Sequence, residues 1–354
     1  MDVQEVVRRR LAANGLAAER PGDPEQVVRS LLAVQSQDVQ PSAWSVAQRL
    51  VGGTEALVEQ ARAQGRLLRT HVLRTTWHDV AAEDLRWLVR LTGPRVLLAT
   101  AGVRCGLGLD DDLLATARRA VEAALPGRSL TRAELAAVLA AAGVVLDSRA
   151  LGHLLMHLEL TGVVCSGERR GRWQTLALLD ERVPPTPERD HATAVAELVR
   201  RFLHGHGPAA VQDLAWWSSL RVSDVRTGLA ALGDAVRRHE VGDLELWRLA
   251  DGPPPAADSG VLLVQLYDEH LVAFTRSKTL SDPERVTSTR TRPYLGVVLQ
   301  DGVVAGSWGR TVGPAGVTVH VAPIGDLDPA AVAAAAQRYG AFLGLPATVR
   351  LKAG

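Results

Sequence analysis

The first strong pattern along the chain is an apolar face at helical spacing, formed by Val27, Val28, Leu31, Leu32 and Val34. Gln40 precedes Pro41, and the residue before a proline disfavours helical backbone, so the helix is expected to end around Gln37. On an intact helix the Gln35 and Gln37 side chains would point about 200° apart. Where a helix unwinds, both amides can converge on one point. The simpler interpretation is that they cap the carbonyls at the helix end.

One order of elements recurs three times in the first 250 residues, and the second copy is the clearest. It starts with a capping box at 131–134, followed by an apolar helix to about Ala142 and a second helix from near Ser148 to Gly162. A hairpin with a basic tip, Glu168-Arg169-Arg170-Gly171-Arg172, comes next. Helix, turn, helix and hairpin is the order of a winged helix.

The other two copies are less regular. The third contains a helix at 192–203, a helix that carries Leu214, Trp216 and Trp217, a helix after Ser223 and a strand pair. The first contains the Gln35 helix, a helix near 54–63 and an extended segment from Leu67 to Trp77. We therefore predict an α+β protein with three tandem winged-helix domains, at 1–105, 106–187 and 188–253.

The pattern changes after the linker Pro253-Pro254-Pro255. Short β-branched segments bounded by turns follow at 260–267, 294–299, 302–308 and 316–322. A helix near 329–343 closes the chain. The region 256–354 is accordingly predicted to be a small C-terminal β module, either a sheet or a barrel.

Composition narrows the class of protein. Of the 354 residues, 47% are hydrophobic and 22% charged, which is typical of globular proteins, and no apolar run is long enough to span a bilayer. Two cysteines form no disulfide framework, so a cytoplasmic location is expected. The net charge is only +1, but Lys278 and Lys352 are the sole lysines, and 38 of the 40 basic residues are arginines. Arginine suits bidentate contact with phosphate.

The histidines make no recognisable metal site. His153 and His157 are four residues apart on one predicted helix, but no glutamate follows the first and no third ligand is evident. A solvated or DNA-facing helix face explains them better, and His204-Gly205-His206 is a weaker candidate still. No phosphate loop, nucleophile elbow or Cys–His pair is present either. We predict no metal.

Three further groups of polar side chains are candidates for a site. Asp268-Glu269-His270 follows an apolar strand, so it either enters a cleft or is a solvated strand end. His71 and Arg74 would lie on opposite faces of a straight strand and would need a bulge to serve one site. Arg169, Arg170 and Arg172 are plausible phosphate contacts, and a merely solvated hairpin tip is the alternative.

Several separated motifs, in order, resemble the AlkZ/YcaQ-type winged-helix DNA glycosylases over nearly the whole chain. They are Leu31-Leu32-Ala33-Val34-Gln35-Ser36-Gln37, Leu68-Arg69-Thr70-His71-Val72-Leu73-Arg74 with Trp77-His78, Arg169-Arg170-Gly171-Arg172, Leu214-Ala215-Trp216-Trp217 and Tyr267-Asp268-Glu269-His270-Leu271-Val272. The resemblance implies excision of bulky alkylated purines, including cross-links and antibiotic adducts. The catalytic Gln, aliphatic residue, Gln or Asp signature of that family falls on Gln35 and Gln37. Ser36 departs from the aliphatic middle position.

The resemblance also assigns partners and further site residues. We expect duplex DNA with an alkylated purine to be the substrate, and His71, Arg74, the three wing arginines, Asp268, Glu269 and His270 to contact DNA. The family grips DNA with a C-terminal β-hairpin that the sequence does not locate.

The residue chemistry agrees with such a reaction. An N3- or N7-alkylated purine is already cationic and leaves without strong protonation, so neutral amides can orient a water and support the oxocarbenium sugar. Lyase activity needs an amine nucleophile, and the chain has few. We predict a monofunctional, hydrolytic, monomeric glycosylase of the cytoplasm and nucleoid, without cofactor. A winged-helix regulator without catalysis and a binder of the free drug are the alternatives.

Overall fold

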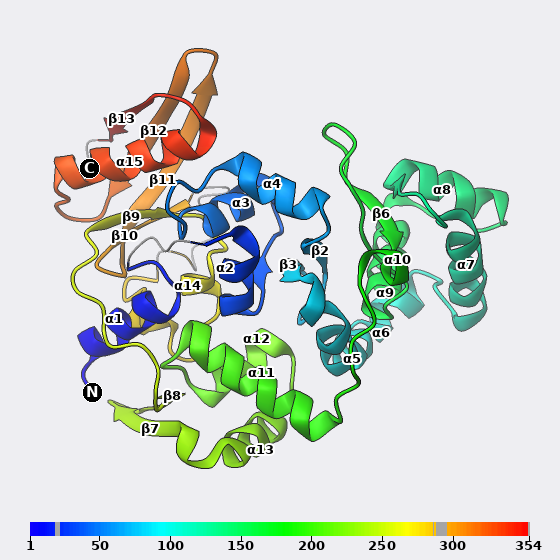
Figure 1. The fold of residues 1–354 in the computed structure, drawn as a ribbon, viewed down its shortest axis with the longest axis horizontal. Helices are drawn as coiled ribbons and strands as arrows, with labels where there is room; N and C mark the ends of the chain where they lie inside the picture. Colours follow the sequence, from blue (N-terminus) through cyan, green and yellow to red (C-terminus); the bar gives the residue numbers. More distant parts are fainter. Residues whose placement is uncertain (18–21, 286, 288–295, 353–354) are drawn as a thin grey trace. The chain divides into compact units, whose positions relative to one another are not determined.

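The computed structural model describes residues 1–17, 22–285, 287 and 296–352, and the chain folds into two compact units (Figure 1). The first unit combines Met1–Glu59, Val195–Trp217 and Arg221–Gly354, and the second combines Gln60–Ala194 with Ser218–Leu220. The chain thus begins the first unit, builds the second and returns. The four-domain division expected from the sequence stays a prediction.

The amino-terminal part of the first unit holds α1 (Val3–Ala13), α2 (Pro24–Leu31), β1 (Val34–Gln35) and α3 (Val39–Ala47). Asp23 caps α2 through a hydrogen bond to the Gln26 N–H, with Pro24 in the first turn. The helix ends at Leu31, because Leu32 adopts a left-handed φ of 67°. The prediction that this helix reaches Gln37 is therefore wrong.

Pro41 does not break a helix as expected, because it lies in the first turn of α3, with Gln40 helical before it. A proline there costs no hydrogen bond, since the N–H groups of a first turn have no partner within the helix. The chain thus leaves one helix and enters the next within seven residues, 32–38. The two candidate amides lie in that short connection.

The later stretches of the first unit carry most of its elements. They are α11 (His191–His206), α12 (Val211–Ser218), α13 (Val222–Leu232), η1 (Gly233–Ala235), β7 (Val236–Val241), β8 (Leu244–Leu249), β9 (Val261–Val264), α14 (Glu269–Val272), η2 (Lys278–Leu280), β10 (Gly296–Gln300), β11 (Val303–Gly313), β12 (Gly316–Pro323), α15 (Pro329–Leu343) and β13 (Ala347–Leu351). The helix predicted near 329–343 is confirmed. Residues 294 and 295 of the strand predicted at 294–299 lie outside the described residues.

The carboxy-terminal module is an open sheet with strand order β13-β12-β11-β10-β9, antiparallel except for the β12–β13 pair. Within the described residues it does not close, so the sheet rather than the barrel is correct. Helix α15 packs along it, and Tyr339 places its ring 4.9 Å from Trp308 of β11 and 5.1 Å from Trp44 of α3. This aromatic contact joins α3 to the sheet. Strands β11 and β12 extend past α15 as a long hairpin (Figure 1).

Helix α4 (Glu55–Ala63) leads into the second unit, whose elements follow the predicted order from residue 131 onward, whereas the helices between residues 82 and 124 were not predicted. They are β2 (Leu67–His71), β3 (Trp77–Ala81), α5 (Ala82–Ala99), α6 (Ala101–Gly106), α7 (Asp111–Ala124), β4 (Leu130–Thr131), α8 (Arg132–Ala141), α9 (Ser148–Leu160), β5 (Val164–Ser166), β6 (Thr175–Leu178) and α10 (Leu179–Arg182). The predicted capping box is present, because Thr131 and Glu134 each accept from the backbone N–H of the other. Leu135, Leu154 and Leu158 are buried in the core of this unit.

Candidate active site

The connection between α2 and α3 places its two amides differently. Gln35 is buried in β1, with 6% of its surface exposed, whereas Gln37 is half-buried in the turn that follows. Because α2 ends at Leu31, neither residue belongs to the last turn of that helix. The two residues are held by the connection itself, next to the start of α3.

Ser36, between the two glutamines, is completely buried although it is polar. Its hydroxyl lies 2.8 Å from the hydroxyl of Ser42 on α3, and the Ser42 hydroxyl also donates to the Val39 carbonyl at 2.9 Å. A buried hydroxyl costs free energy unless it is hydrogen-bonded. The Ser42 contact therefore explains how a serine is accommodated where an aliphatic residue was expected.

Glu269, at the start of α14, anchors the Gln35 backbone. The Gln35 N–H donates a 2.7 Å hydrogen bond to Oε1 of Glu269, and the Trp217 indole N–H donates to Oε2 at 2.9 Å. His206 places Nε2 3.4 Å from the same Oε2, while its Nδ1 donates to the Phe202 carbonyl at 3.1 Å. Glu269, Trp217 and His206 have no exposed surface. The Gln35 strand is thus tied to a buried carboxylate.

Asp268, the N-cap residue of α14 directly before Glu269, is also held by buried hydrogen bonds. Arg49 donates to both of its carboxylate oxygens, at 2.8 and 3.0 Å, and the Ser45 hydroxyl donates at 2.8 Å. Burial alone would raise the pKa of Asp268, but the Arg49 guanidinium and these hydrogen bonds hold it below its ordinary value. Asp268 therefore stays ionised and fastens the loop to α3.

His270 completes the buried cluster. Its Nε2 donates to the Gly302 carbonyl at 2.9 Å, and burial lowers its pKa to about 4. Asp268, Glu269 and His270 all have 0% exposed surface. This corrects the expectation that these three side chains contact DNA, because a duplex meets a protein at its surface. Neither sequence alternative, cleft or solvated strand end, describes them.

The second unit holds His71 and Arg74 at the end of β2. His71 is buried, and its Nδ1 hydrogen-bonds to the Glu159 carboxylate of α9. Leu73 has a φ of 66°, so the chain turns directly after the strand instead of continuing straight. Arg74 lies half-buried, with Nη2 3.3 Å from His78 Nε2. Burial, and then the Arg74 charge, lower the pKa of His78 well below its ordinary value.

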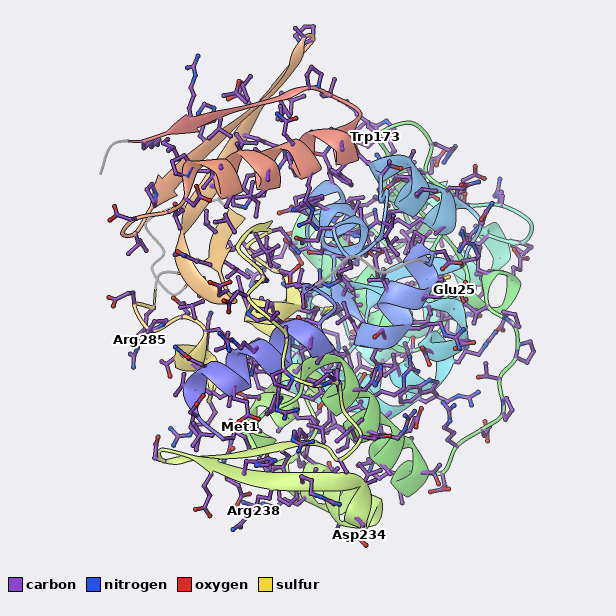
Figure 2. All side chains as sticks on the ribbon, turned by 60° about the vertical axis from the view of Figure 1, so that its left-hand side comes forward. Met1, Glu25, Trp173, Asp234, Arg238 and Arg285 are labelled. Carbon is purple, nitrogen blue, oxygen red and sulfur yellow. The ribbon has the colours of Figure 1, made fainter. Side chains whose placement is uncertain are left out.

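The hairpin tip between β5 and β6 presents its basic residues to solvent. Trp173 is 57% exposed (Figure 2), and the Arg172 guanidinium lies 4.5 Å from its ring centroid. Arg170 is exposed and forms an ion pair with Glu134 of α8, which lowers the Glu134 pKa to about 2. Arg169 is half-buried at the base of the tip. Of the predicted basic contacts, Arg170 and Arg172 are the most accessible.

Sequence reasoning missed the partners of Glu269. His206 belongs to a His-Gly-His segment that was weighed only as a weak metal site, and Trp217 was noted without a role. The sequence carries no signal that separates the two adjacent tryptophans, but the structure does: Trp217 is completely buried, whereas Trp216 is 44% exposed. Among the described residues, no three histidine, cysteine or acidic side chains are placed to hold a metal ion. No helix in the described part of the chain is long and apolar enough to cross a membrane.

Chemically, the connection offers two neutral amide side chains, and the backbone of one of them, Gln35, is hydrogen-bonded to the buried Glu269 carboxylate. The carboxylate oxygens of Glu269 already accept N–H groups, so Glu269 is suited to electrostatic support rather than proton transfer. Charge stabilisation of this kind is strong in a low-dielectric interior. The site is suited to supporting a developing cation next to a held water.

Comparisons with known proteins identify the family to which the sequence and the fold are similar. A family model described as DNA glycosylase AlkZ-like matches residues 28–342. The fold is similar to that of the Streptomyces sahachiroi DNA glycosylase AlkZ, with a TM-score of 0.81 and 22% sequence identity over 99% of this chain and 100% of that chain. No curated protein matches the chain.

Proposed function

The chain belongs to the AlkZ-like DNA glycosylase family and is therefore a DNA-repair glycosylase, and we propose that Gln35 and Gln37 are its catalytic residues in the hydrolysis of N3- and N7-alkylated purines. The observation that carries this proposal is the anchoring of the Gln35 backbone to the buried Glu269 carboxylate at 2.7 Å. A fixed backbone preorganises the amides, and such preorganisation lowers the barrier without any titratable catalyst.

The substrate class follows from the absence of an acid in the proposed catalytic pair. An alkylated purine with a positive ring departs as a neutral base, so the enzyme needs to stabilise only the sugar cation and deliver water. The amides orient that water, and the buried charge of Glu269 favours the cation from behind Gln35. Bulky adducts, those of DNA-alkylating antibiotics and cross-links included, belong to this class, which connects the enzyme to self-resistance.

Hydrolysis rather than lyase chemistry fits the positions of the amines. Lys278 is half-buried on η2, where burial lowers its pKa and Asp282 opposes that effect. Lys352 is exposed after β13. Neither is among the contacts of the Gln35–Glu269 cluster described above. A monofunctional, monomeric enzyme without cofactor is the form we propose.

We propose that three winged-helix domains, at 1–105, 106–187 and 188–253, and the module at 256–354 grip the duplex. The second domain would present Arg170 and Arg172 to the phosphates, since arginines at an exposed tip position a protein on the backbone without reading sequence. Arg74 and Arg169 are secondary candidates, whereas buried His71 would support β2. The β11–β12 hairpin, with its exposed tip at 314–315, is the candidate for the DNA-gripping hairpin of the family.

The test uses a duplex methylated at guanine N7, followed by alkaline cleavage of the abasic sites. The parent should release base, and Gln37→Ala and Gln35→Ala should each slow single-turnover release by about 100-fold, the scale for removing one preorganised dipole. Gln300→Ala, at an exposed position on β10, is the control and should release base at the parental rate. Equal rates for the parent and both glutamine variants would exclude the assignment.

A further inference from the structure

A pocket of about 550 Å³ lies in the first unit, between α3, the loop after β9, strands β10 and β11, and α15. Its walls include the rings of Trp44, Tyr267, Trp308 and Tyr339. A volume of several hundred Å³ is typical of sites for small molecules, for which about 300–1,000 Å³ is usual. The pocket is thus large enough for a substantial aromatic group.

Two segments of the chain that line the pocket continue directly into the candidate active site. Asp38 lines it and directly follows Gln37. Gln265 lines it as well, in the short loop that continues to Glu269, the residue that holds the Gln35 N–H. A group that extends from a purine held at the two amides therefore has this pocket as its neighbouring space.

The aromatic walls are fixed in place. The Trp44 indole N–H donates to the Leu263 carbonyl at 2.6 Å, and that of Trp308 donates to the Val264 carbonyl at 2.8 Å. Both indole donors are used within the protein, so these rings offer a ligand only their apolar faces and edges. Such surfaces favour planar aromatic groups by stacking and edge contacts.

Gln265 supplies a directed polar contact in this apolar setting. It is 94% buried, since 6% of its surface is exposed, and its Oε1 accepts the Tyr267 backbone N–H at 3.1 Å. That bond fixes which end of the amide is oxygen. No described residue accepts a hydrogen bond from the other end, the Nε2 donor. A buried donor without an acceptor costs about 1–3 kcal/mol, so a ligand that brings an acceptor is favoured.

The charges around the pocket argue against a phosphate as that ligand. Arg310 lines the pocket, but its guanidinium donates to the Gln40 side-chain carbonyl and lies 5.6 Å from the Tyr339 ring centroid. Asp38 places a carboxylate in the same lining and would repel an anion. An uncharged acceptor, such as a carbonyl oxygen, avoids that repulsion.

Resting on the proposed function, we propose that this pocket receives the part of a bulky adduct that extends beyond the purine, a planar aromatic group bearing a carbonyl acceptor for Gln265. The pocket thereby selects among alkylated bases by what is attached to them. Small alkyl adducts would leave it unused and would be released at a rate set by the two amides alone.

The test compares three duplexes that differ only at guanine N7: a phenacyl group with ring and carbonyl, a 2-phenylethyl group with ring alone, and methyl. For the parent, the ratio of the phenacyl to the phenylethyl release rate should exceed the same ratio for uncatalysed release by about tenfold. Tenfold corresponds to one hydrogen bond of about 1.4 kcal/mol. Gln265→Glu keeps an oxygen for the Tyr267 N–H but removes the donor, and Gln265→Met removes both. Both should erase the preference and leave methyl release unchanged.

The controls separate the pocket from the active site. Gln300→Met, an exposed glutamine of the same sheet, should keep the parental preference. A preference that persists in both Gln265 variants, or in Gln265→Glu alone, overturns the proposal. Equal slowing of all three substrates also overturns it, because Gln265 would then support the catalytic connection.

If the parent releases no base, the proposed function fails instead. Equilibrium binding of the same duplexes then tests the pocket proposal separately. Equal affinity for the phenacyl and phenylethyl duplexes overturns that proposal.

Discussion

The backbone N–H of Gln35 and the carboxylate of Glu269 meet across 2.7 Å, although 234 positions of sequence separate them. Glu269 also accepts the Trp217 indole N–H and has no exposed surface. The proposed catalytic connection is therefore held through the backbone of Gln35. This relationship turns Glu269 from an expected DNA contact into a positioning residue.

Replacing Glu269 by glutamine should slow base release while preserving DNA affinity. A glutamine has one acceptor oxygen, so either the Gln35 N–H or the Trp217 N–H loses its partner. A hydrogen bond to a charged group contributes about 1.5–3 kcal/mol, so we expect the single-turnover rate at saturating DNA to fall roughly 10- to 100-fold. Glu245→Gln, on β8 with its carboxylate half exposed, is the matched control. An unchanged rate would remove Glu269 from the mechanism.

The chemical step should be nearly independent of pH between about 7 and 9. Neither glutamine titrates, and a cationic purine needs no protonation to leave. Single-turnover release of N7-methylguanine across that range measures this directly, with the uncatalysed release followed in parallel. A bell-shaped profile would show that a titratable group, Glu269 or a nearby histidine, transfers a proton in the rate-limiting step.

Stability, in contrast, should fall as the pH drops from about 6.5 to 4. Burial lowers the folded-state pKa of His270 to about 4, below its ordinary value of 6.5. In that window the unfolded chain binds a proton that the folded protein does not, so the free energy of unfolding decreases by about 3 kcal/mol in all. Urea unfolding at several pH values measures it. His78, whose pKa is also lowered well below its ordinary value, contributes to the slope in the same range. His270→Gln should therefore reduce the slope rather than remove it, and an equally steep variant curve would assign the slope to another group.

The Asp268 contribution lies in a different pH range. Its folded-state pKa is below the ordinary value, so its contribution to stability is present at neutral pH and is lost only as the carboxylate becomes protonated. That loss occurs below about pH 4. The His270 and Asp268 effects can therefore be distinguished in one titration, with the histidine effect above pH 4 and the aspartate effect below it.

The hairpin tip of the second unit should contribute phosphate contacts. Arg172→Ala and Arg170→Ala should each weaken binding to undamaged and damaged duplexes alike and reduce the slope of log affinity against log salt by about 1. The larger loss of affinity is expected for Arg172, because Arg170 already forms an ion pair with Glu134, which partly neutralises its charge. Arg118→Ala, an exposed arginine paired with Glu122 on α7, should leave the slope unchanged. A loss confined to damaged DNA would contradict a phosphate role.

Much of the fold followed from local sequence. The capping box at Thr131 and Glu134 and the helix Pro329–Leu343 were predicted because capping residues and apolar spacing act over a few positions. The break at Leu32 was not, because a left-handed leucine carries no local signal. Pro41 was misjudged for a related reason: the same residue that stops a helix also starts one.

For the candidate site too, local sequence signals supported predictions, whereas contacts between distant residues could not be predicted. The assignment of Gln35 and Gln37 comes from the sequence and stays a prediction, whereas the burial of Asp268, Glu269 and His270 was not predicted. Their partners lie between 32 positions away, for Gly302, and 234 positions away, for Gln35. An acidic run after a strand looks the same in sequence whether it faces solvent or a distant arginine such as Arg49. Only tertiary structure distinguishes the two.

The construction of the first unit from three separate stretches of the chain also sets an order of events during synthesis. Gln35 leaves the ribosome 234 residues before the carboxylate that positions it, which at usual elongation rates is a delay of roughly 10–50 s. Residues 60–194, which make up nearly all of the second unit, are produced within that interval. A nascent chain therefore carries the arginines that we propose contact DNA before the proposed catalytic connection is complete. A ribosome that stalls before Glu269 yields a fragment in which the Gln35 N–H lacks its carboxylate partner.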